Sequence, residues 1–521
     1  MNLKKSLVIT SILSSMIFTG CSKDDVQKNA SNSTSKDKGE LSIFLVNNGK
    51  PFDAEWEIYQ EASKKNNVKL TSYASKTNTD SIQSFNLMVA SNNLADLISH
   101  RMGDLEKLGT QGGVIPLNDL IDKHAPNLKK FMEENPELRK TMVSADGKIY
   151  TVPTFYDFYK ARTSYGLFMR TDWLKRYNLP VPTNLDELKT ALTTFREQDA
   201  NGNGKKDEIG IFIRGNSRNA LESLMSIFGC RPSKTFYVAE DGKINFVPLD
   251  PNYKESIKII AQWYKDGLID PEVFTRGWGA RDAVLPTNLG AMTSDWFGST
   301  ANYNNLSSTI PGFEFLPIKP IQIKEGLNSR FMARNTTNEW AWAISAQAKD
   351  PVKAMEFMDW WFSPEGRRTW NFGIENKHYT MVDGQPIFTD YVLKNENGKS
   401  PLQVLQESGA QIAGIGVQQD VEYENQWTNE IAKKGSEMYM EPGVMTEPMP
   451  ILKFTTQELK DYEKIMANVN QITEEHLQKW ILGSGDVDKE WDAYVAQIKQ
   501  NNLNKAIEIV QTSYDRYKAI K

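Results

Sequence analysis

Residues 41–49 read LSIFLVNNG, and this stretch decides the fold class. Its first six residues are apolar except for one serine, which is typical of a strand buried inside a sheet. The Asn-Asn-Gly that follows is a turn signal. The next segment is a helical stretch that places Trp56, Tyr59 and Ala62 on one face. A strand, a turn and an amphipathic helix in this order predict the first unit of an α/β protein.

Amphipathic helices recur along the rest of the chain. Apolar residues with i, i+3, i+4 and i+7 spacing occur within 188–195, 354–361 and 491–498. The first of these helices is predicted to begin at a capping box made by Thr183 and Asp186. Because such helices alternate with short apolar runs and no solenoid repeat is found, we expect α/β layers with largely parallel strand pairing.

Length and composition limit the functional class. The chain has 521 residues, of which 40% are hydrophobic, and this length suits two to three domains. A net charge of −5 argues against nucleic-acid binding, which leaves a basic footprint. The cysteines are Cys21 and Cys230; if Cys21 is modified, Cys230 has no partner and no internal disulfide forms.

Several catalytic motifs are missing from the sequence. Gly204-Lys205 is followed by a lysine instead of the Ser or Thr of a phosphate loop, and no Gly-x-Ser-x-Gly elbow occurs. The histidines, His100, His124, His378 and His476, form no His-Glu-x-x-His pair. A catalytic pair of carboxylates, as in glycosidases, stays an open alternative, although no particular pair stands out. We therefore expect that the protein is not an enzyme.

The N-terminus carries an export signal. Lys4 and Lys5 precede an apolar stretch from Leu7 to Phe18, which is too short to span a bilayer. Phe18-Thr19-Gly20-Cys21 resembles a bacterial lipoprotein box, although such boxes usually carry Leu in place of Phe18. An ordinary signal peptide with an incidental cysteine is the alternative.

The segment after the signal is strongly polar. Residues 22–38 read SKDDVQKNASNSTSKDK, which cannot bury enough surface to fold. We expect residues 1–20 to be the signal peptide and 21–39 a disordered tether. The mature protein is then extracytoplasmic and anchored to the cell membrane by acylated Cys21.

A calcium-loop pattern lies at residues 199–208, DANGNGKKDE. Oxygen-bearing side chains fall at loop positions 1, 3, 5 and 9, and Gly204 stands at position 6, where an EF-hand loop turns sharply. The predicted ligands of a structural Ca²⁺ are Asp199, Asn201, Asn203, the carbonyl of Lys205, Asp207 and Glu208. The pattern departs from an EF-hand at position 12, which is Gly210. An Asn-Gly-rich surface turn without a metal is the alternative.

Longer stretches resemble a family. They resemble extracellular solute-binding protein family 1 of carbohydrate ABC importers, and they are residues 113–121 (GVIPLNDLI), 147–153 (GKIYTVP), 170–174, 350–354 and 363–366 (SPEG), with the tail from 481 to 517. These motifs are most similar to those of the large lipoprotein branch of the family, and the calcium loop is similar to that of alginate-binding members. The resemblance implies a hinged type II periplasmic-binding-protein fold of two α/β lobes with the ligand in the cleft between them.

The resemblance also implies a division of the chain into lobes. We expect the N-lobe to begin with 40–165 and the C-lobe with 166–305, which contains the calcium loop. Residues 306–375 are expected to return to the N-lobe, and 376–521 to complete the C-lobe with helices.

The expected function is capture of an oligosaccharide and its delivery to the permease subunits and their ATPase by a monomeric protein. Sugar rings stack on aromatic side chains, and their hydroxyls need polar groups. The candidate contacts, for each of which core or surface packing is the alternative, are Asn48, His100, Arg101, Tyr156, Tyr159, Arg162, Trp278, Asp295, Trp296 and Trp427. Arg101 and Arg162 favour a uronate-containing ligand, such as an alginate- or glycosaminoglycan-derived fragment. The alternatives are a neutral oligosaccharide, a surface glycan hydrolase or lyase, and an adhesin.

Overall fold

The computed structural model describes residues 39–520 except for 48, 158–162, 216, 234, 398 and 442–443. The signal peptide, the tether with Cys21, and the candidate contacts Asn48, Tyr159 and Arg162 lie outside the described residues. Among the described residues, no helix has the length and apolar character needed to cross a membrane.

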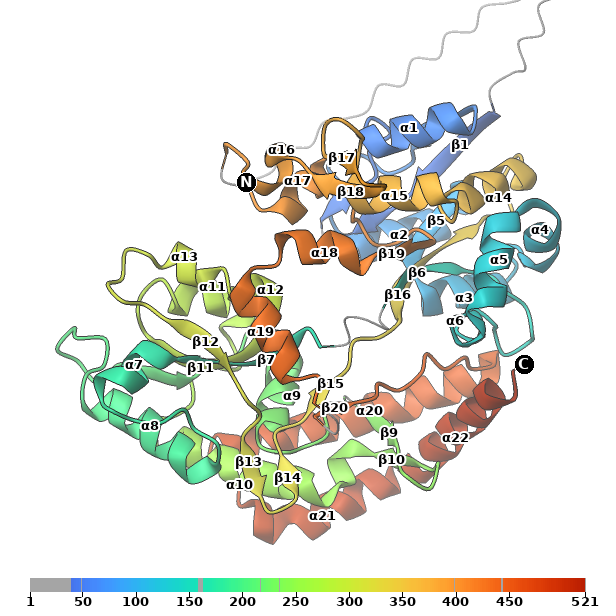
Figure 1. The fold of residues 1–521 in the computed structure, drawn as a ribbon. Coiled ribbons are helices and arrows are strands. Elements are labelled where there is room, and N and C mark those ends of the chain that lie inside the picture. Colours follow the sequence, from blue (N-terminus) through green and yellow to red (C-terminus); the bar gives the residue numbers. More distant parts are fainter. Residues whose placement is uncertain are drawn as a thin grey trace, which may run out of the picture. The chain divides into compact units, whose positions relative to one another are not determined.

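A six-stranded sheet forms the centre of the first lobe (Figure 1). Its strands, in spatial order, are β19 (Val417–Gln419), β6 (Val152–Tyr156), β16 (Thr337–Ile344), β5 (Leu97–Arg101), β1 (Gly39–Phe44) and β4 (Val68–Ser72). Leu41 and Ile43 of β1 face one core and Phe44 faces another, as the two-residue period of a strand requires. Both faces of this sheet are therefore covered.

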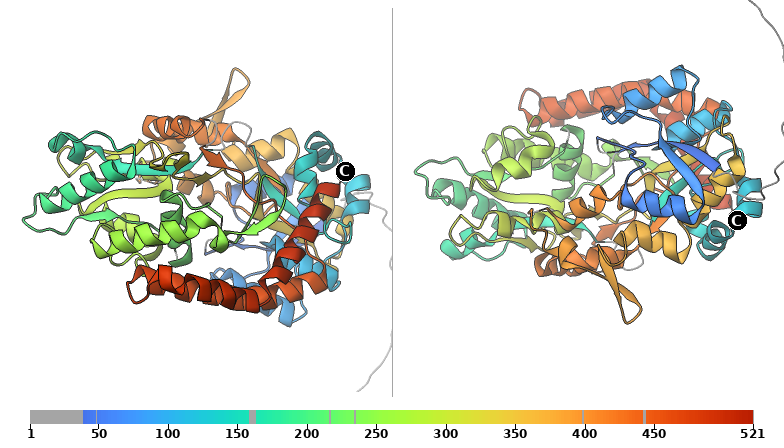
Figure 2. Two further views of the ribbon diagram at one scale, coloured as in Figure 1. Left: turned by 90° about the horizontal axis from the view of Figure 1, so that it is seen from below. Right: turned by 90° about the horizontal axis from the view of Figure 1, so that it is seen from above.

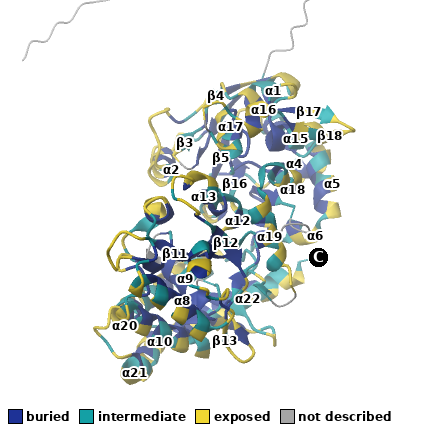
Figure 3. Ribbon diagram, turned by 60° about the vertical axis from the view of Figure 1, so that its left-hand side comes forward, coloured by how far each residue is buried: buried dark blue, intermediate teal, exposed yellow. Residues whose placement is uncertain are grey.

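Helices cover the two faces unequally. The face that Leu41 joins packs against residues of α1 (Glu57–Lys65), α4 (Asn118–His124), α5 (Pro126–Glu134), α6 (Pro136–Lys140), α14 (Pro351–Trp360), α15 (Pro364–Phe372), α16 (Asp390–Leu393), α17 (Pro401–Glu407) and α18 (Val421–Trp427). The face that Phe44 joins packs against α2 (Ser81–Ala90) and α3 (Met102–Thr110). The buried strands and the exposed outer helix faces are distinguished in Figure 3.

A four-stranded sheet forms the centre of the second lobe. Its order is β12 (Phe315–Ile318), β7 (Tyr165–Arg170), β11 (Gly290–Trp296) and β8 (Ile209–Ile211). One large core joins this sheet to α7 (Thr171–Arg176), α8 (Leu185–Glu197), α9 (Ser217–Ile227), α10 (Pro251–Lys265), α11 (Ala280–Val284), α12 (Phe297–Thr300), α13 (Tyr303–Leu306) and α19 (Glu430–Met438). The last three helices belong to the same core: α20 (Thr456–Ile481), α21 (Val487–Gln500) and α22 (Leu503–Ala519), drawn red in Figure 2.

Short two-stranded pairs and two 3₁₀ turns complete the described elements. The pairs are β2 (Val46–Asn47) with β3 (Lys50–Pro51), β9 (Phe236–Val238) with β10 (Ile244–Phe246), β13 (Gln322–Lys324) with β14 (Leu327–Asn328), β15 (Phe331–Met332) with β20 (Met445–Thr446), and β17 (Tyr379–Val382) with β18 (Gln385–Phe388). The turns are η1 (Val247–Leu249) and η2 (Gly277–Gly279).

The strand pairing is more mixed than the sequence predicts. β1 pairs in parallel with β4 and β5, but β16 runs antiparallel to both β5 and β6. In the second sheet, β7 runs antiparallel to β11 and β12. β7 enters the second sheet directly after β6 of the first sheet, and β16 enters the first sheet after the chain returns from the second lobe. Neither strand is joined to its neighbours by the crossover helix that makes adjacent strands parallel.

The predicted helix at 188–195 is present, but its cap is shifted by one residue. Leu188, Ala191, Leu192 and Phe195 of α8 are all buried. The N-cap is Asn184, whose Oδ1 accepts a hydrogen bond from the Glu187 N–H (3.0 Å). The Glu187 carboxylate in turn accepts the Thr183 N–H (2.8 Å). Asn184 is therefore the cap, because an Asn side chain caps as well as Thr, and Glu187 binds the residue before the cap.

Two of the expected segments contain elements of both lobes. β12 lies within 306–375 and pairs with β7 of the second lobe, whereas β16 pairs in the first. Within 376–521, β19 pairs in parallel with β6 of the first lobe, whereas α19 to α22 belong to the core of the second. The chain thus changes lobes between β15 and β16 and again between α18 and α19.

Candidate ligand-binding cleft

A cleft of about 1060 Å³ is lined by residues from both lobes. Several of them stand where strands of the two sheets end: Arg101 ends β5, Tyr156 ends β6 and Trp296 ends β11. Tyr165 begins β7 and is paired with Trp296 across the sheet. In α/β proteins, loops at strand ends carry ligand contacts, because the sheet fixes their positions.

The wall from the second lobe presents two exposed indole rings. Trp278 in η2 is 58% exposed and Trp296 is 42% exposed, and both line the cleft. The Trp296 ring meets Tyr165 edge to face, with centroids 5.7 Å apart. Flat rings that remain exposed in a concave site can stack on the C–H faces of a sugar.

Asp295 fixes the arrangement of this wall. It is 1% exposed, and its Oδ1 accepts hydrogen bonds from Arg214 Nε (2.8 Å) and from the Trp296 backbone N–H (2.8 Å). Its Oδ2 accepts Arg281 Nη1 at 3.0 Å. Both carboxylate oxygens are therefore occupied, so Asp295 holds other side chains in place instead of offering itself to a ligand.

The wall from the first lobe is more polar. Arg101 is exposed at the start of α3, and Asp104 lies one turn further along the same helix. Tyr156 is hydrogen-bonded to Asn338 Nδ2 of β16, and burial raises the pKa of the Tyr156 phenol. This wall offers hydrogen-bonding groups and one aromatic ring.

Arg334 links the two walls. It lies in the segment between β15 and β16, where the chain crosses from the second lobe to the first. Its guanidinium lies over the Tyr156 ring (5.2 Å) and near the Trp296 ring (5.9 Å), and Nη1 donates to Glu424 Oε2 at 2.9 Å. A charged group thus connects an aromatic ring from each lobe.

Two predicted contacts lie away from the cleft lining. The His100 ring is 2% exposed, stacks on Phe85 (centroids 4.0 Å apart) and places Nδ1 2.9 Å from Asp104 Oδ2. Both faces of β5 are covered, so its residues stay buried until Arg101. Trp427 ends α18, and its ring centroid lies 6.0 Å from that of Tyr423. The Trp427 ring also lies against α12, because a Cβ on Gly298 of that helix would contact it.

Several lining residues were not predicted. They are Arg214, Arg334, Tyr165, Ser223 and Asn338. Arg214 follows the apolar run that ends at Ile213, so the rule that selected Arg101 would have found it as well. Arg334 lies between two strands whose pairing partners are far apart in sequence, and no local pattern marks it.

The predicted calcium loop folds tightly around its own side chains. Asp199 Oδ1 and Oδ2 accept the N–H groups of Asn203 (3.0 Å) and Gly204 (2.8 Å), and Gly204 has the positive φ that the turn needs (80°). Asn201 and Asn203 donate to Asp207 (both 2.9 Å), which lowers the pKa of Asp207. The side-chain oxygens of Asp199, Asn201 and Asn203 thus accept backbone N–H groups of the loop itself.

The surroundings of Glu208 show whether the loop suits a metal ion. Its Oε1 accepts the Asn201 N–H at 3.0 Å, whereas Oε2 is buried and has no hydrogen-bond partner in the described part of the chain. Burial raises the pKa of this carboxyl, which is the expected result when a counter-charge is lacking. Among the described residues, no group of three or more His, Cys, Asp or Glu is arranged to hold a metal. The Asn side chains and the carbonyl of Lys205 would have to supply the other oxygens.

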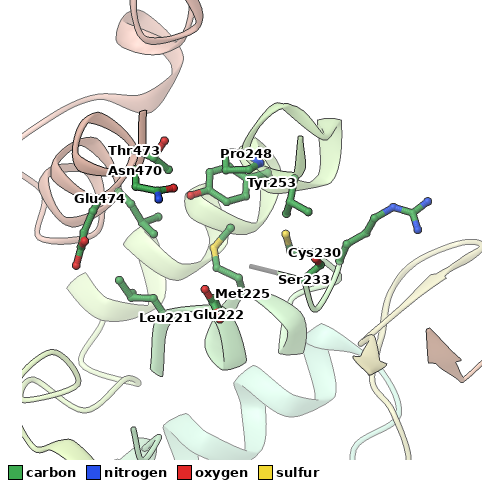
Figure 4. Close-up of a pocket in the computed structure, with 13 residues that line it drawn as sticks. Leu221, Glu222, Met225, Cys230, Ser233, Pro248, Tyr253, Asn470, Thr473 and Glu474 are labelled. Carbon is green, nitrogen blue, oxygen red and sulfur yellow. The ribbon is translucent and has the colours of Figure 1, made fainter. Parts of the chain in front are cut away.

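A small cavity of about 60 Å³ lies inside the second lobe (Figure 4). Met225, Cys230, Tyr253 and Leu477 line it, and Glu222 and Ser233 line both this cavity and the cleft. Cys230 is buried and has no disulfide partner in the described part of the chain, and burial strongly raises the pKa of its thiol. The cavity is too small for a sugar ring.

Comparison with known proteins decides the family. The family described as bacterial extracellular solute-binding protein matches residues 57–371. The chain belongs to this family. The predicted family and the two-lobe fold are thereby confirmed.

Individual relatives of this solute-binding protein cover most of the chain. The fructooligosaccharide ABC transporter substrate-binding protein FusA of Streptococcus pneumoniae serotype 4 (strain ATCC BAA-334 / TIGR4) is 28% identical over 89% of this chain and 87% of its own. The alginate-binding protein AlgQ2, solved without calcium ion, is 34% identical, with a TM-score of 0.80 over 92% of this chain and 99% of its own. An EF-hand mutant of FusA in complex with fructo-nystose is 26% identical, with a TM-score of 0.74 over 92% and 100%.

Proposed function

We propose that this solute-binding protein captures an oligosaccharide in the cleft and delivers it to the permease and ATPase of an ABC importer. The observation that carries the proposal is the pair of exposed rings, Trp278 and Trp296, on one wall of a cleft lined by both lobes. A ligand that contacts both walls binds the closed arrangement better and shifts the population towards it, and the permease then senses that state.

The proposed ligand is a uronate-containing oligosaccharide, such as an alginate- or glycosaminoglycan-derived fragment. Arg101 lines the cleft, and the similarity to alginate-binding AlgQ2 supports the same class. Asp104, Glu222 and Glu339 also line the cleft, so positive charge is local and not spread over the walls. A neutral oligosaccharide is the alternative, which the fructooligosaccharide-binding relative FusA favours.

The proposal includes binding without turnover. The relatives FusA and AlgQ2 are described as binding proteins. The sequence singles out no pair of carboxylates as a catalytic pair. Calorimetry with purified protein and a panel of uronate and neutral oligosaccharides tests this. We expect one ligand per protein, recovered intact by mass spectrometry. Cleavage of any panel member would support a hydrolase or lyase, and the failure of every saccharide to bind would overturn the proposal.

We also propose a structural Ca²⁺ in the loop 199–208. Asp199, Asn201, Asn203, Lys205 through its carbonyl, Asp207 and Glu208 would hold it, and the ion would supply the charge that buried Glu208 lacks. The existence of an EF-hand mutant of FusA and of a calcium-free AlgQ2 supports an ion in relatives.

Anchoring through Cys21 completes the proposal. The relative LipO of Bacillus subtilis (strain 168), 23% identical over 74% of this chain, is described as a lipoprotein. We expect the protein to be an extracytoplasmic monomer, and Cys21→Ala to release it from the membrane fraction after a salt wash. Retention of the variant in washed membranes would overturn the anchor. The lobe boundaries and the contacts at Asn48, Tyr159 and Arg162 stay predictions.

A further inference from the structure

In the wall of the second lobe, two arginines contact one buried carboxylate. Arg214 and Arg281 share the single carboxylate of Asp295, through contacts of 2.8 and 3.0 Å. Arg281 is held by groups of the protein itself, because its Nη1 also donates to Ser299 Oγ and Thr300 Oγ1, both at 2.8 Å. Arg281 therefore donates to three acceptors, whereas the described hydrogen bond of Arg214 is to Asp295 alone.

Arg214 has donors to spare on the side of the cleft. A guanidinium carries five N–H donors, and the described hydrogen bond to Asp295 uses only Nε. The side chain lines the cleft and is 19% exposed, so a ligand can reach it while much of the surrounding water is excluded. A charge-assisted bond in such a setting is about twice as strong as a neutral one.

The stacking rings are placed beside this cation. The Arg214 guanidinium lies 5.9 Å from the centroid of Trp278. The Trp296 N–H and Arg214 Nε bind the same oxygen of Asp295, so one buried carboxylate sets the positions of both. A ring stacked on Trp278 would bring a substituent close to Arg214, and Trp296 directly follows the carboxylate that Arg214 binds.

The other cleft arginines are less suited to an anion. Arg334 is paired with Glu424 at 2.9 Å and lies against Tyr156. Arg101 is exposed on the opposite wall, with Asp104 on the same face of α3, and exposed charges contribute little when solvent screens them.

We propose that Arg214 is the anion-recognition residue of the cleft and binds an oxyanion carried by a sugar ring that stacks on Trp278 or Trp296. This inference rests on the proposed oligosaccharide function and assigns its selectivity to one residue. A uronate carboxylate and a sulfate ester are the two sources of such an oxyanion, and both have the geometry that a guanidinium fork can bind.

The test compares each acidic sugar with its neutral counterpart. The uronate oligosaccharide that binds tightest in the panel, its carboxyl-reduced form and a sulfated form of the reduced sugar are titrated into wild type, Arg214→Gln and Arg214→Lys. We expect Arg214→Gln to weaken uronate binding about tenfold to a hundredfold and to leave the affinity for the reduced sugar within about threefold. Arg214→Lys should lie between them, because it keeps the charge and loses the fork.

Two further variants control for charge and position. Lys243→Gln removes one positive charge from a site whose side chain is 77% exposed and outside the cleft, and it should leave uronate binding unchanged. Arg101→Gln removes a charge from the opposite wall and should cost less than Arg214→Gln. Circular dichroism and melting curves verify that each variant folds.

The outcomes separate this inference from the proposed function. Equal losses for the uronate and the reduced sugar, or a larger loss with Arg101→Gln, would overturn the role of Arg214 and leave oligosaccharide capture intact. Binding of neutral sugars alone would also overturn it. If no saccharide binds the wild type, the proposed function itself fails. Tighter binding of the sulfated sugar than of the uronate would support Arg214 and identify sulfate as the anion.

Discussion

The two walls of the cleft differ in how their side chains are held. The second lobe presents Trp278 and Trp296 with exposed faces, and behind them the buried carboxylate of Asp295 fixes Trp296 and Arg214. The first lobe presents exposed Arg101 and half-buried Asp104, and Asp104 contacts the buried His100 ring. The difference predicts that an oligosaccharide bound in the cleft gains most of its binding energy from the second lobe.

The largest effect is expected from Asp295, the buried carboxylate of the second wall. Asp295→Asn leaves Arg214 and Arg281 without their shared counter-charge, and breaking a buried ion pair typically costs about 3–5 kcal/mol. We expect this loss in the free energy of unfolding measured with urea. Asp104→Asn, whose side chain is 47% exposed, is the matched change on the first wall and should cost under about 1 kcal/mol. Equal losses would remove the distinction between the walls.

Calcium removal should affect the second lobe without affecting the cleft. An ion present at a hundred times its Kd stabilises the folded state by about 2.7 kcal/mol, so a chelator or Asp199→Ala should lower Tm. Because residues 199–208 do not line the cleft, the oligosaccharide affinity should stay within about twofold. Differential scanning calorimetry and metal analysis of dialysed protein measure both effects. An unchanged Tm with no detectable calcium contradicts the site.

Loss of a stacking ring should weaken binding directly. Trp278→Ala and Trp296→Ala are each expected to cost about 1–3 kcal/mol of binding free energy, by comparison with aromatic anchors at other interfaces. Trp427→Phe is the control, because Trp427 packs against Tyr423 and α12 and does not line the cleft. Calorimetry that found Trp427→Phe as damaging as Trp296→Ala would contradict the assignment of stacking to the second wall.

The smallest effect is expected on the first wall. Tyr156→Phe removes a phenol that is hydrogen-bonded to Asn338 but keeps the ring under Arg334. A hydrogen bond between neutral groups contributes about 0.5–1.5 kcal/mol, so the affinity should fall no more than about tenfold. A loss greater than that of Trp278→Ala would show that the first lobe holds the ligand more tightly than its architecture indicates.

Local patterns in the sequence predicted the elements better than their connections. The apolar run at 41–46 became β1 and β2, and the stripes at 188–195 and 354–361 are buried helix faces. The direction of β16 was missed, because antiparallel entry depends on where the chain crosses between lobes. No spacing within 337–344 encodes that crossing.

The candidate site was predicted in part for a similar reason. Arg101, Tyr156, Trp278, Asp295 and Trp296 line the cleft, since they stand at or next to the ends of strands or, for Trp278, in a 3₁₀ turn. His100 is one residue before Arg101, yet it is packed on Phe85, because a strand covered on both faces buries every residue before its end. The role of Asp295 as a positioning residue depends on Arg214 and Arg281, which are distant in sequence and meet only in the folded lobe.

The discontinuous make-up of the first sheet has a consequence for folding. β5 pairs with β1 on one side and with β16 on the other, and β6 gains its outer partner only when β19 is present. At about 5–20 residues per second, the ribosome makes β5 many seconds before Thr337 of β16. During that interval β5 has an unpaired edge, which invites chaperone binding or aggregation.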